Sequence, residues 1–172
     1  HKGRTRPVPG NHDYGTGNAN AYYDYFGGNA GPSGLGFYSF ELGAWHIVTL
    51  NSNVPAGTAS LQAQWLRTDL ESTTARCVAA LWHHPLFSSG PNGNSPFMRD
   101  LYQILYDFGA DLVLVGHDHM YERFAPQDPN GRLDTVRGMR QFVVGTGGVP
   151  LYDFQAPKPN SEVRLKVHGV MK

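Results

Sequence analysis

The sequence predicts an α/β protein in which short buried strands alternate with amphipathic helices. Three apolar segments, residues 45–50, 77–82 and 112–115, have the length and composition of strands. Between them, residues 60–72 and 97–108 carry apolar side chains at helical spacing. The resulting order, strand–helix–strand–helix–strand, is typical of consecutive βαβ units with parallel strands.

Further elements are expected before these units. Residues 19–26 are rich in aromatic side chains and predict a short helix that ends at two glycines. Residues 37–42 predict a strand, and the Gly43-Ala44 link joins it to the strand at 45–50 as an antiparallel hairpin. His46 lies inside the second strand of this hairpin, so we expect it to be a structural histidine.

Local boundary residues support the helices and the remaining strands. Ser60 can cap the first long helix, and Gly109 can end the second. Residues 125–139 form a polar connection with a turn sequence, followed by a strand at 141–145. Residues 162–168 alternate in polarity, which predicts one more strand.

Composition narrows the class of protein. In a chain of 172 residues, 40% hydrophobic and 16% charged residues indicate a globular domain. Lysine plus arginine equals aspartate plus glutamate at 14 each, which argues against a broad basic face for nucleic acid. No apolar run approaches the roughly 20 residues that span a bilayer. The single cysteine, Cys77, lies in an apolar run and is expected to be a small core residue. Oligomeric state stays open.

Polar residues rich in histidine gather in three places. These are Asn11-His12-Asp13, His83-His84 and His117-Asp118-His119, which contain five of the eight histidines. The second and third clusters directly follow apolar strands, and parallel strands would bring His83 and His117 to the same edge of the sheet. Imidazole is a good ligand for zinc, iron, nickel and copper, so we expect a metal site. The H-x-H pattern alone would fit a solvated polar loop equally well.

These clusters together resemble a known family. Gly10-Asn11-His12-Asp13, His83-His84-Pro85 and Gly116-His117-Asp118-His119, in this order, are similar to the motifs of the calcineurin-like metallophosphoesterases. The Tyr121-Glu122-Arg123 continuation and the Gly-Thr-Gly-Gly sequence at 145–148 resemble the purple acid phosphatase branch. The resemblance implies metal-dependent hydrolysis of phosphate monoesters, by hydroxide activated at a centre of two metal ions.

The resemblance also implies an α/β/β/α sandwich of four layers. The family's first strands would lie upstream of Asn11, so we expect residues 1–172 to form a single, partial catalytic domain that is cut at both ends. The missing N-terminal strands should leave an exposed sheet edge.

Metal ligands follow by motif position. The resemblance implies that Asn11, His83 and His117 bind one metal ion and that His119 binds the other. The ions would be divalent or trivalent iron, zinc or manganese, and their identity stays open. The bridging carboxylate of the family would lie upstream of Asn11, where the ten residues of this chain contain no acid. We therefore expect the isolated chain to bind metal poorly and to be weakly active or inactive.

Substrate contacts follow in the same way. The resemblance implies that His12 faces a small phosphorylated substrate, where it steadies the phosphoryl oxygens or protonates the leaving alkoxide. Asp13 would orient His12 by accepting a proton from its ring. His84 is either a substrate-binding residue or a packing residue.

Two alternatives to a monoesterase remain. One is a phosphodiesterase or nuclease on the same scaffold, which the balanced charge disfavours for long polynucleotides. The other is a non-catalytic remnant that binds a phosphorylated ligand or partner. The resemblance implies an extracellular location, but the sequence contains no targeting segment, so location stays open.

Overall fold

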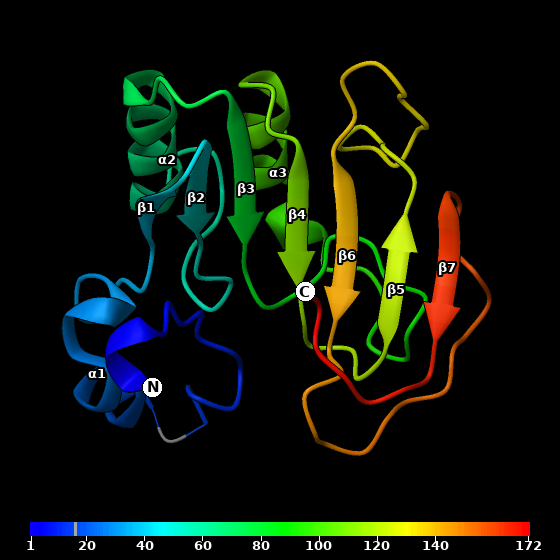
Figure 1. Cartoon of the computed structure of the whole chain (residues 1–172), viewed down its shortest axis with the longest axis horizontal. Helices are drawn as coiled ribbons and strands as arrows, with labels where there is room; N and C mark the ends of the chain where they lie inside the picture. The colour runs from blue at the N-terminus through cyan, green and yellow to red at the C-terminus, as the bar shows by residue number, and fades with distance from the viewer. Residues whose placement is uncertain (16) are drawn as a thin grey trace.

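The computed structural model describes residues 1–15 and 17–172, and its strands form one mixed seven-stranded sheet (Figure 1). The strands are β1 Tyr38–Leu42, β2 Trp45–Thr49, β3 Cys77–Leu81, β4 Leu112–Val115, β5 Tyr121–Phe124, β6 Arg140–Val144 and β7 Ser161–Leu165. The helices are α1 Asn20–Phe26, α2 Leu61–Ser72 and α3 Arg99–Asp107, with short 3₁₀ turns η1 Lys2–Arg4, η2 Gly27–Ala30 and η3 Pro96–Met98. The strand order across the sheet is β1-β2-β3-β4-β6-β5-β7.

The centre of the sheet is parallel. Strands β2, β3, β4 and β6 are parallel neighbours, with Leu81 of β3 opposite Leu114 of β4. In Figure 1 these four strands point towards the side of the molecule that holds the N-terminal segment and α1. The loops that follow the four strands therefore leave the sheet on that side, where βαβ sheets place ligands.

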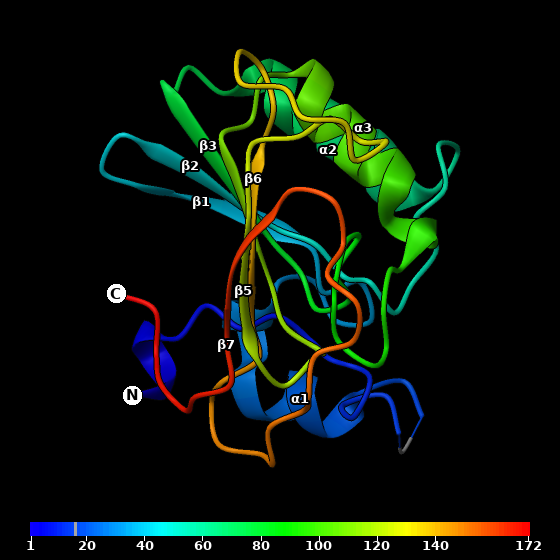
Figure 2. The same ribbon diagram turned by 90° about the vertical axis from the view of Figure 1, so that its right-hand side faces the viewer.

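Helices α2 and α3 cover one face of the sheet (Figure 2). Alternate strand residues on this face, such as Val48, Val113 and Val143, are fully buried and belong to one core with the helices. On the opposite face, Leu81 and Leu114 are only half buried. The predicted α/β class is confirmed, and the chain supplies one sheet and one helical layer of the expected four. The sequence predicted an exposed sheet edge, whereas the structure leaves a whole face of the sheet without a helical layer.

Local sequence signals predicted most of the helices and strands correctly. The hairpin is present, with β1 and β2 antiparallel. Ser60 caps α2, because its Oγ accepts the Ala63 N–H at 3.1 Å. Gly109 follows α3 with φ of +74°, a conformation that glycine adopts readily. Within the described residues, no helix is long and apolar enough to cross a membrane.

One strand was not predicted, and one expectation was wrong. Residues 121–124 form strand β5, although the sequence showed this segment only as a polar motif. Its centre is charged, and Glu122 is nevertheless fully buried. Cys77 is not a core residue: it begins β3 and is partly exposed.

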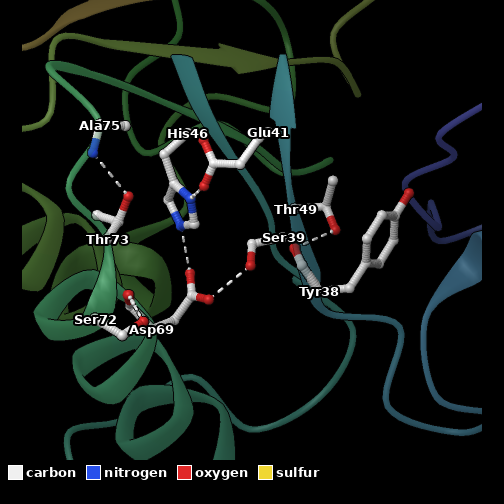
Figure 3. A network of polar contacts seen from close by, with 9 residues as sticks. All are labelled: Tyr38, Ser39, Glu41, His46, Thr49, Asp69, Ser72, Thr73 and Ala75. Carbon is white, nitrogen blue, oxygen red and sulfur yellow. Dashed lines mark hydrogen bonds and ion pairs between the residues drawn. The ribbon is translucent and has the colours of Figure 1, made fainter. Parts of the chain in front are cut away.

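His46 ties the hairpin to α2, as Figure 3 shows. Its Nδ1 lies 2.7 Å from Glu41 Oε1, and its Nε2 lies 2.7 Å from Asp69 Oδ2. Asp69 also accepts the Ser39 hydroxyl at 2.6 Å. Both ring nitrogens can donate only when the imidazole is charged. Burial by itself lowers the pKa of His46, but the hydrogen bonds and charges of Glu41 and Asp69 outweigh it and raise the pKa. The expected structural role of His46 agrees with these contacts.

This network predicts a pH-dependent stability. The folded-state pKa of His46 lies above its ordinary value of 6.5, so the stabilisation is complete below that pH and is lost as pH rises through the folded-state pKa. We expect His46→Gln, which cannot carry the charge, to lower the free energy of unfolding more at about pH 5.5 than at about pH 8.5. Urea unfolding of both proteins measures the difference. An equal loss at both pH values would contradict a charged His46.

Candidate metal centre

The loop after β2 holds the N-terminal motif against the sheet. Asn53 Nδ2 donates to the Pro9 carbonyl at 3.0 Å, and Asn51 Nδ2 donates to the Tyr14 hydroxyl at 2.7 Å. The Tyr14 hydroxyl in turn lies 3.2 Å from the Tyr23 hydroxyl in α1. The Gly-Asn-His-Asp motif is therefore fixed on both flanks, before Gly10 and after Asp13, although it lies in a loop.

Three polar atoms from three segments converge at the strand ends. Asn11 Oδ1 lies 2.8 Å from His83 Nε2, and His83 Nε2 lies 3.1 Å from His117 Nδ1. An amide oxygen and two imidazole nitrogens are all able to coordinate a cation. The His83 ring also packs on the N-terminal motif, because a Cβ at Gly10 would lie 3.0 Å from ring atoms of His83. The structure thus brings together the three residues that the sequence assigned to one ion.

His84 lies in the same group. One nitrogen each of His83, His84 and His117 lie within 4.8 Å of one another, and the ring centres of His84 and His117 are 4.4 Å apart. Ser52 Oγ accepts the His84 N–H at 3.1 Å and lies 2.7 Å from His84 Nδ1. The Ser52 hydroxyl has one proton and two lone pairs, so it can donate to Nδ1 or accept from it, and the contact fits either tautomer of the neutral His84 ring.

His119 stands apart from this group and has its own support. Its Nδ1 lies 3.0 Å from the Pro150 carbonyl, which can only accept, so Nδ1 carries the proton and Nε2 has the lone pair. The ring stacks on Tyr152, with centres 4.1 Å apart and planes 18° apart. Within the described residues, His119 is therefore not part of the cluster formed by His83, His84 and His117.

An open cavity extends between His83 and His117 on one side and His119 on the other. It has a volume of about 610 Å³ and is lined by four histidines, His12, His83, His117 and His119, together with residues that follow β6. His12 is exposed, as a residue that meets substrate should be. The cavity therefore contains every imidazole of the three sequence clusters except His84.

Asp13 does not lie where the resemblance placed it. Its Oδ2 accepts the Gly10 N–H at 2.8 Å, and within the described residues its carboxylate makes no hydrogen bond with the His12 ring. The short loop closes on itself because Asp13 N also donates to the Gly10 carbonyl at 3.2 Å. Asp13 therefore shapes the motif's backbone and leaves the His12 ring without this partner.

Burial and mutual repulsion keep these imidazoles neutral. Burial, followed by the charges of the neighbouring histidines, lowers the pKa of His83 to about 3. Burial and then His117 lower the pKa of His84 to about 4. Burial also lowers the pKa of His117, against an opposing effect of Asp118. A metal ligand must be deprotonated, so the metal-free site is already in the ligating protonation state at neutral pH.

Comparison with known proteins agrees with this geometry. Residues 2–121, more than half of the chain, match the model of the calcineurin-like phosphoesterase family. The chain belongs to this family.

Its relatives include purple acid phosphatases. Purple acid phosphatase 15 of Arabidopsis thaliana is 32% identical over 125 residues, which are 69% of this chain and 23% of that protein. Human acid phosphatase type 7 is 29% identical over an alignment that covers 94% of this chain and 44% of that protein. The calcineurin-like chain thus spans less than half the length of these relatives.

Solved structures share the fold. A purple acid phosphatase, PPD1, from yellow lupin seeds superposes with a TM-score of 0.79 at 21% identity, over 94% of this chain and 34% of that one. GAP50, described as the anchor in the inner membrane complex of Plasmodium, superposes with a TM-score of 0.63 at 19% identity, over 92% and 54% of the two chains. At such identities the likeness concerns the fold alone.

Some residues around the site escaped the sequence analysis. Ser52 and Tyr152 lie in loops without a motif, and their contacts with His84 and His119 depend on how distant loops pack. Asp118 lay inside a motif that was singled out, yet nothing in the sequence distinguished it from a solvated acid. It is fully buried.

The lowered pKa values give a direct prediction. In the metal-free protein, the ring resonances of His83 and His84 should titrate with midpoints near 3 and 4, well below the ordinary value of 6.5. Their burial disfavours the charged ring, so both should stay neutral through mildly acidic pH. Histidine NMR over a pH series, with His83→Gln and His84→Gln to assign the signals, measures the midpoints. Midpoints close to 6.5 would mean that the histidine cluster is open to water.

Proposed function

We propose that this chain supplies the imidazole side of a metal centre that hydrolyses phosphate monoesters. The observation that carries the proposal is the convergence of Asn11 Oδ1, His83 Nε2 and His117 Nδ1 at the ends of neighbouring strands. Membership of the calcineurin-like phosphoesterases and the purple acid phosphatase relatives support this assignment.

Each ligand has a distinct place in the proposed centre. Asn11, His83 and His117 would hold one ion, and His119 would hold a second through Nε2, because Nδ1 is committed to the Pro150 carbonyl. Bound as a pair, the ions would supply Lewis-acid chemistry for the attack of water on phosphorus. Nitrogen and amide-oxygen donors admit zinc, iron or manganese, so the donor set fits the metals of the resemblance without choosing among them.

The remaining histidines would contact the substrate. The Ser52 hydroxyl occupies His84 Nδ1, so Nε2 is the ring nitrogen left to contact a phosphoryl oxygen, to which it donates in the Nε2-protonated tautomer. We therefore assign His84 to substrate binding and not to packing. His12 lines the cavity and is exposed, so it is the group that would donate a proton to the leaving alkoxide.

Charge limits what this chain can do by itself. Within residues 1–15 and 17–172, the ligand cluster contains His83, His84 and His117 and no carboxylate. Neutral donors do not offset the repulsion between two adjacent cations. We propose that binding of the second ion, and with it fast turnover, needs acidic ligands in addition to this set. An extracellular location rests on the resemblance alone.

Metal binding is the first test. Zinc titrated into the wild-type chain by calorimetry should bind with one dominant site, and His83→Ala and His117→Ala should each weaken it by at least about tenfold. His46→Gln, which changes a histidine outside the cavity, is the matched control and should bind zinc as the wild type does. Equal affinity in all four proteins would contradict the proposed ligands.

Activity is the second test. With an aryl phosphate and added zinc, manganese or iron, this chain should turn over far more slowly than the roughly 1–10³ s⁻¹ of ordinary enzymes. The residual rate should fall further in His117→Ala and in His12→Ala, because these changes remove a ligand and the proton donor. Turnover in the ordinary range would show that the neutral ligands suffice.

A non-catalytic binder of phosphorylated ligands is the second candidate. The absence of a carboxylate from the cluster of the described residues favours it. Elemental analysis separates the two, since a remnant without the centre would purify without stoichiometric metal and would show no zinc-dependent heat.

A further inference from the structure

A buried carboxylate lies between the two histidines of the H-x-H motif. Asp118 is 0% exposed, although its neighbours His117 and His119 both line the open cavity. Its Oδ2 accepts the hydroxyl of Ser88, and its Oδ1 accepts Asn92 N at 3.1 Å and Asn92 Nδ2 at 2.9 Å. Every partner belongs to the loop that follows β3. The H-x-H motif is therefore hydrogen-bonded, through Asp118, to the loop that follows β3.

The packing around this carboxylate is tight on two sides. A Cβ at Gly90 would lie 2.6 Å from Asp118 Oδ2, so the loop reaches the carboxylate only with a glycine there. On the other side, a Cβ at Gly145 would collide with the Asp118 carbonyl. Asp118 has no room to turn between the segments after β3 and β6.

The same loop holds an unfavourable backbone conformation. His117 has φ of +66°, in the left-handed region that residues with a side chain rarely adopt. Such a conformation persists only where the surroundings determine it. The contacts that determine it here are Asp118 N to the Gly116 carbonyl at 2.8 Å, Met120 N to the Asp118 carbonyl at 2.8 Å and the side-chain bonds of Asp118.

We propose that Asp118 is a positioning residue: its carboxylate, fastened to Ser88 and Asn92, holds His117 and His119 in the arrangement that binds metal. The inference rests on the proposed metal-binding function and deepens it. Asp118 is not one of the proposed metal ligands, and it would act through the two histidines on either side. A motif freed from the β3 loop would let His117 relax and move its Nδ1 away from His83.

A second buried carboxylate provides a matched control. Glu122 is also 0% exposed and binds the next serine, with Ser89 N at 2.8 Å and Ser89 Oγ at 2.5 Å. It lies in β5, beyond the histidines, and its other partner is Ser161 of β7. Loss of either carboxylate removes buried hydrogen bonds, but only Asp118 lies between the histidines.

The experiment compares zinc affinity in four proteins. Calorimetric titration with zinc alone should show binding at least about tenfold weaker in Asp118→Asn and in Ser88→Ala than in the wild type. Glu122→Gln should lose stability without a comparable loss of zinc affinity. Ser88→Ala keeps the negative charge of Asp118, so it separates positioning from simple attraction between carboxylate and cation. If Asp118→Asn does not fold, Ser88→Ala and Asn92→Ala carry the test.

A second readout needs no metal. In metal-free protein, hydrogen exchange of the Met120 amide should be faster in Asp118→Asn and Ser88→Ala than in Glu122→Gln. Wild-type zinc affinity in Asp118→Asn, or equal losses in Asp118→Asn and Glu122→Gln, would overturn the positioning role. Weaker zinc binding in Asp118→Asn without weaker zinc binding in Ser88→Ala would overturn the positioning role too, because Asp118 would then act only through its negative charge. A wild-type chain that binds no zinc would instead overturn the metal site, and the Met120 exchange would still decide whether Asp118 holds the loop.

Discussion

The parallel pairing of β3 with β4 is the constraint on which the centre depends. Leu81 lies opposite Leu114, and two residues later the His83 carbonyl accepts the Gly116 N–H at 3.0 Å. The histidines that follow each strand are thereby brought side by side, with His83 Nε2 3.1 Å from His117 Nδ1. A shift of one residue in this register would turn the strand side chains to the other face and would separate the histidines. The core under α2 and α3, with Val113 and Val115 fully or nearly fully buried, fixes the register.

The pKa values of His46 and His83 are shifted in opposite directions. His46 is enclosed by two carboxylates and has a raised pKa, whereas His83 is enclosed by other histidines and has a lowered one. His46 hydrogen-bonds as a charged group to Glu41 in the sheet and to Asp69 in helix α2. His83 is a neutral ligand in the proposed centre. Burial lowers the pKa of both imidazoles, and only the carboxylates beside His46 turn its net shift upward.

The acids around the site, of which Asp118 and Glu122 are buried and Asp13 is exposed, form hydrogen bonds within the scaffold. Asp118 and Glu122 fasten consecutive serines of one loop, and Asp13 closes the turn of the N-terminal motif. Within the described residues, none of these carboxylates belongs to the histidine cluster. The centre thus has rigid, preorganised, neutral donors. Rigid placement favours binding of a first cation, whereas neutrality disfavours a second one beside it.

The sequence by itself determined the α/β class, the hairpin, the capped helix at Ser60 and the three histidine clusters, because periodicity, caps and motif order are local properties. It also paired His83 with His117, since parallel strands end at a common edge. Tertiary structure alone decided that Glu122 could lie buried in a strand, that Asp13 faces Gly10 and that Asp118 is fastened to Ser88. Those outcomes depend on partners at least 26 residues away in the case of Asp118, and on the exact closure of a loop in the case of Asp13. The sequence gives the type of each polar residue, but tertiary packing determines which group becomes its hydrogen-bond partner.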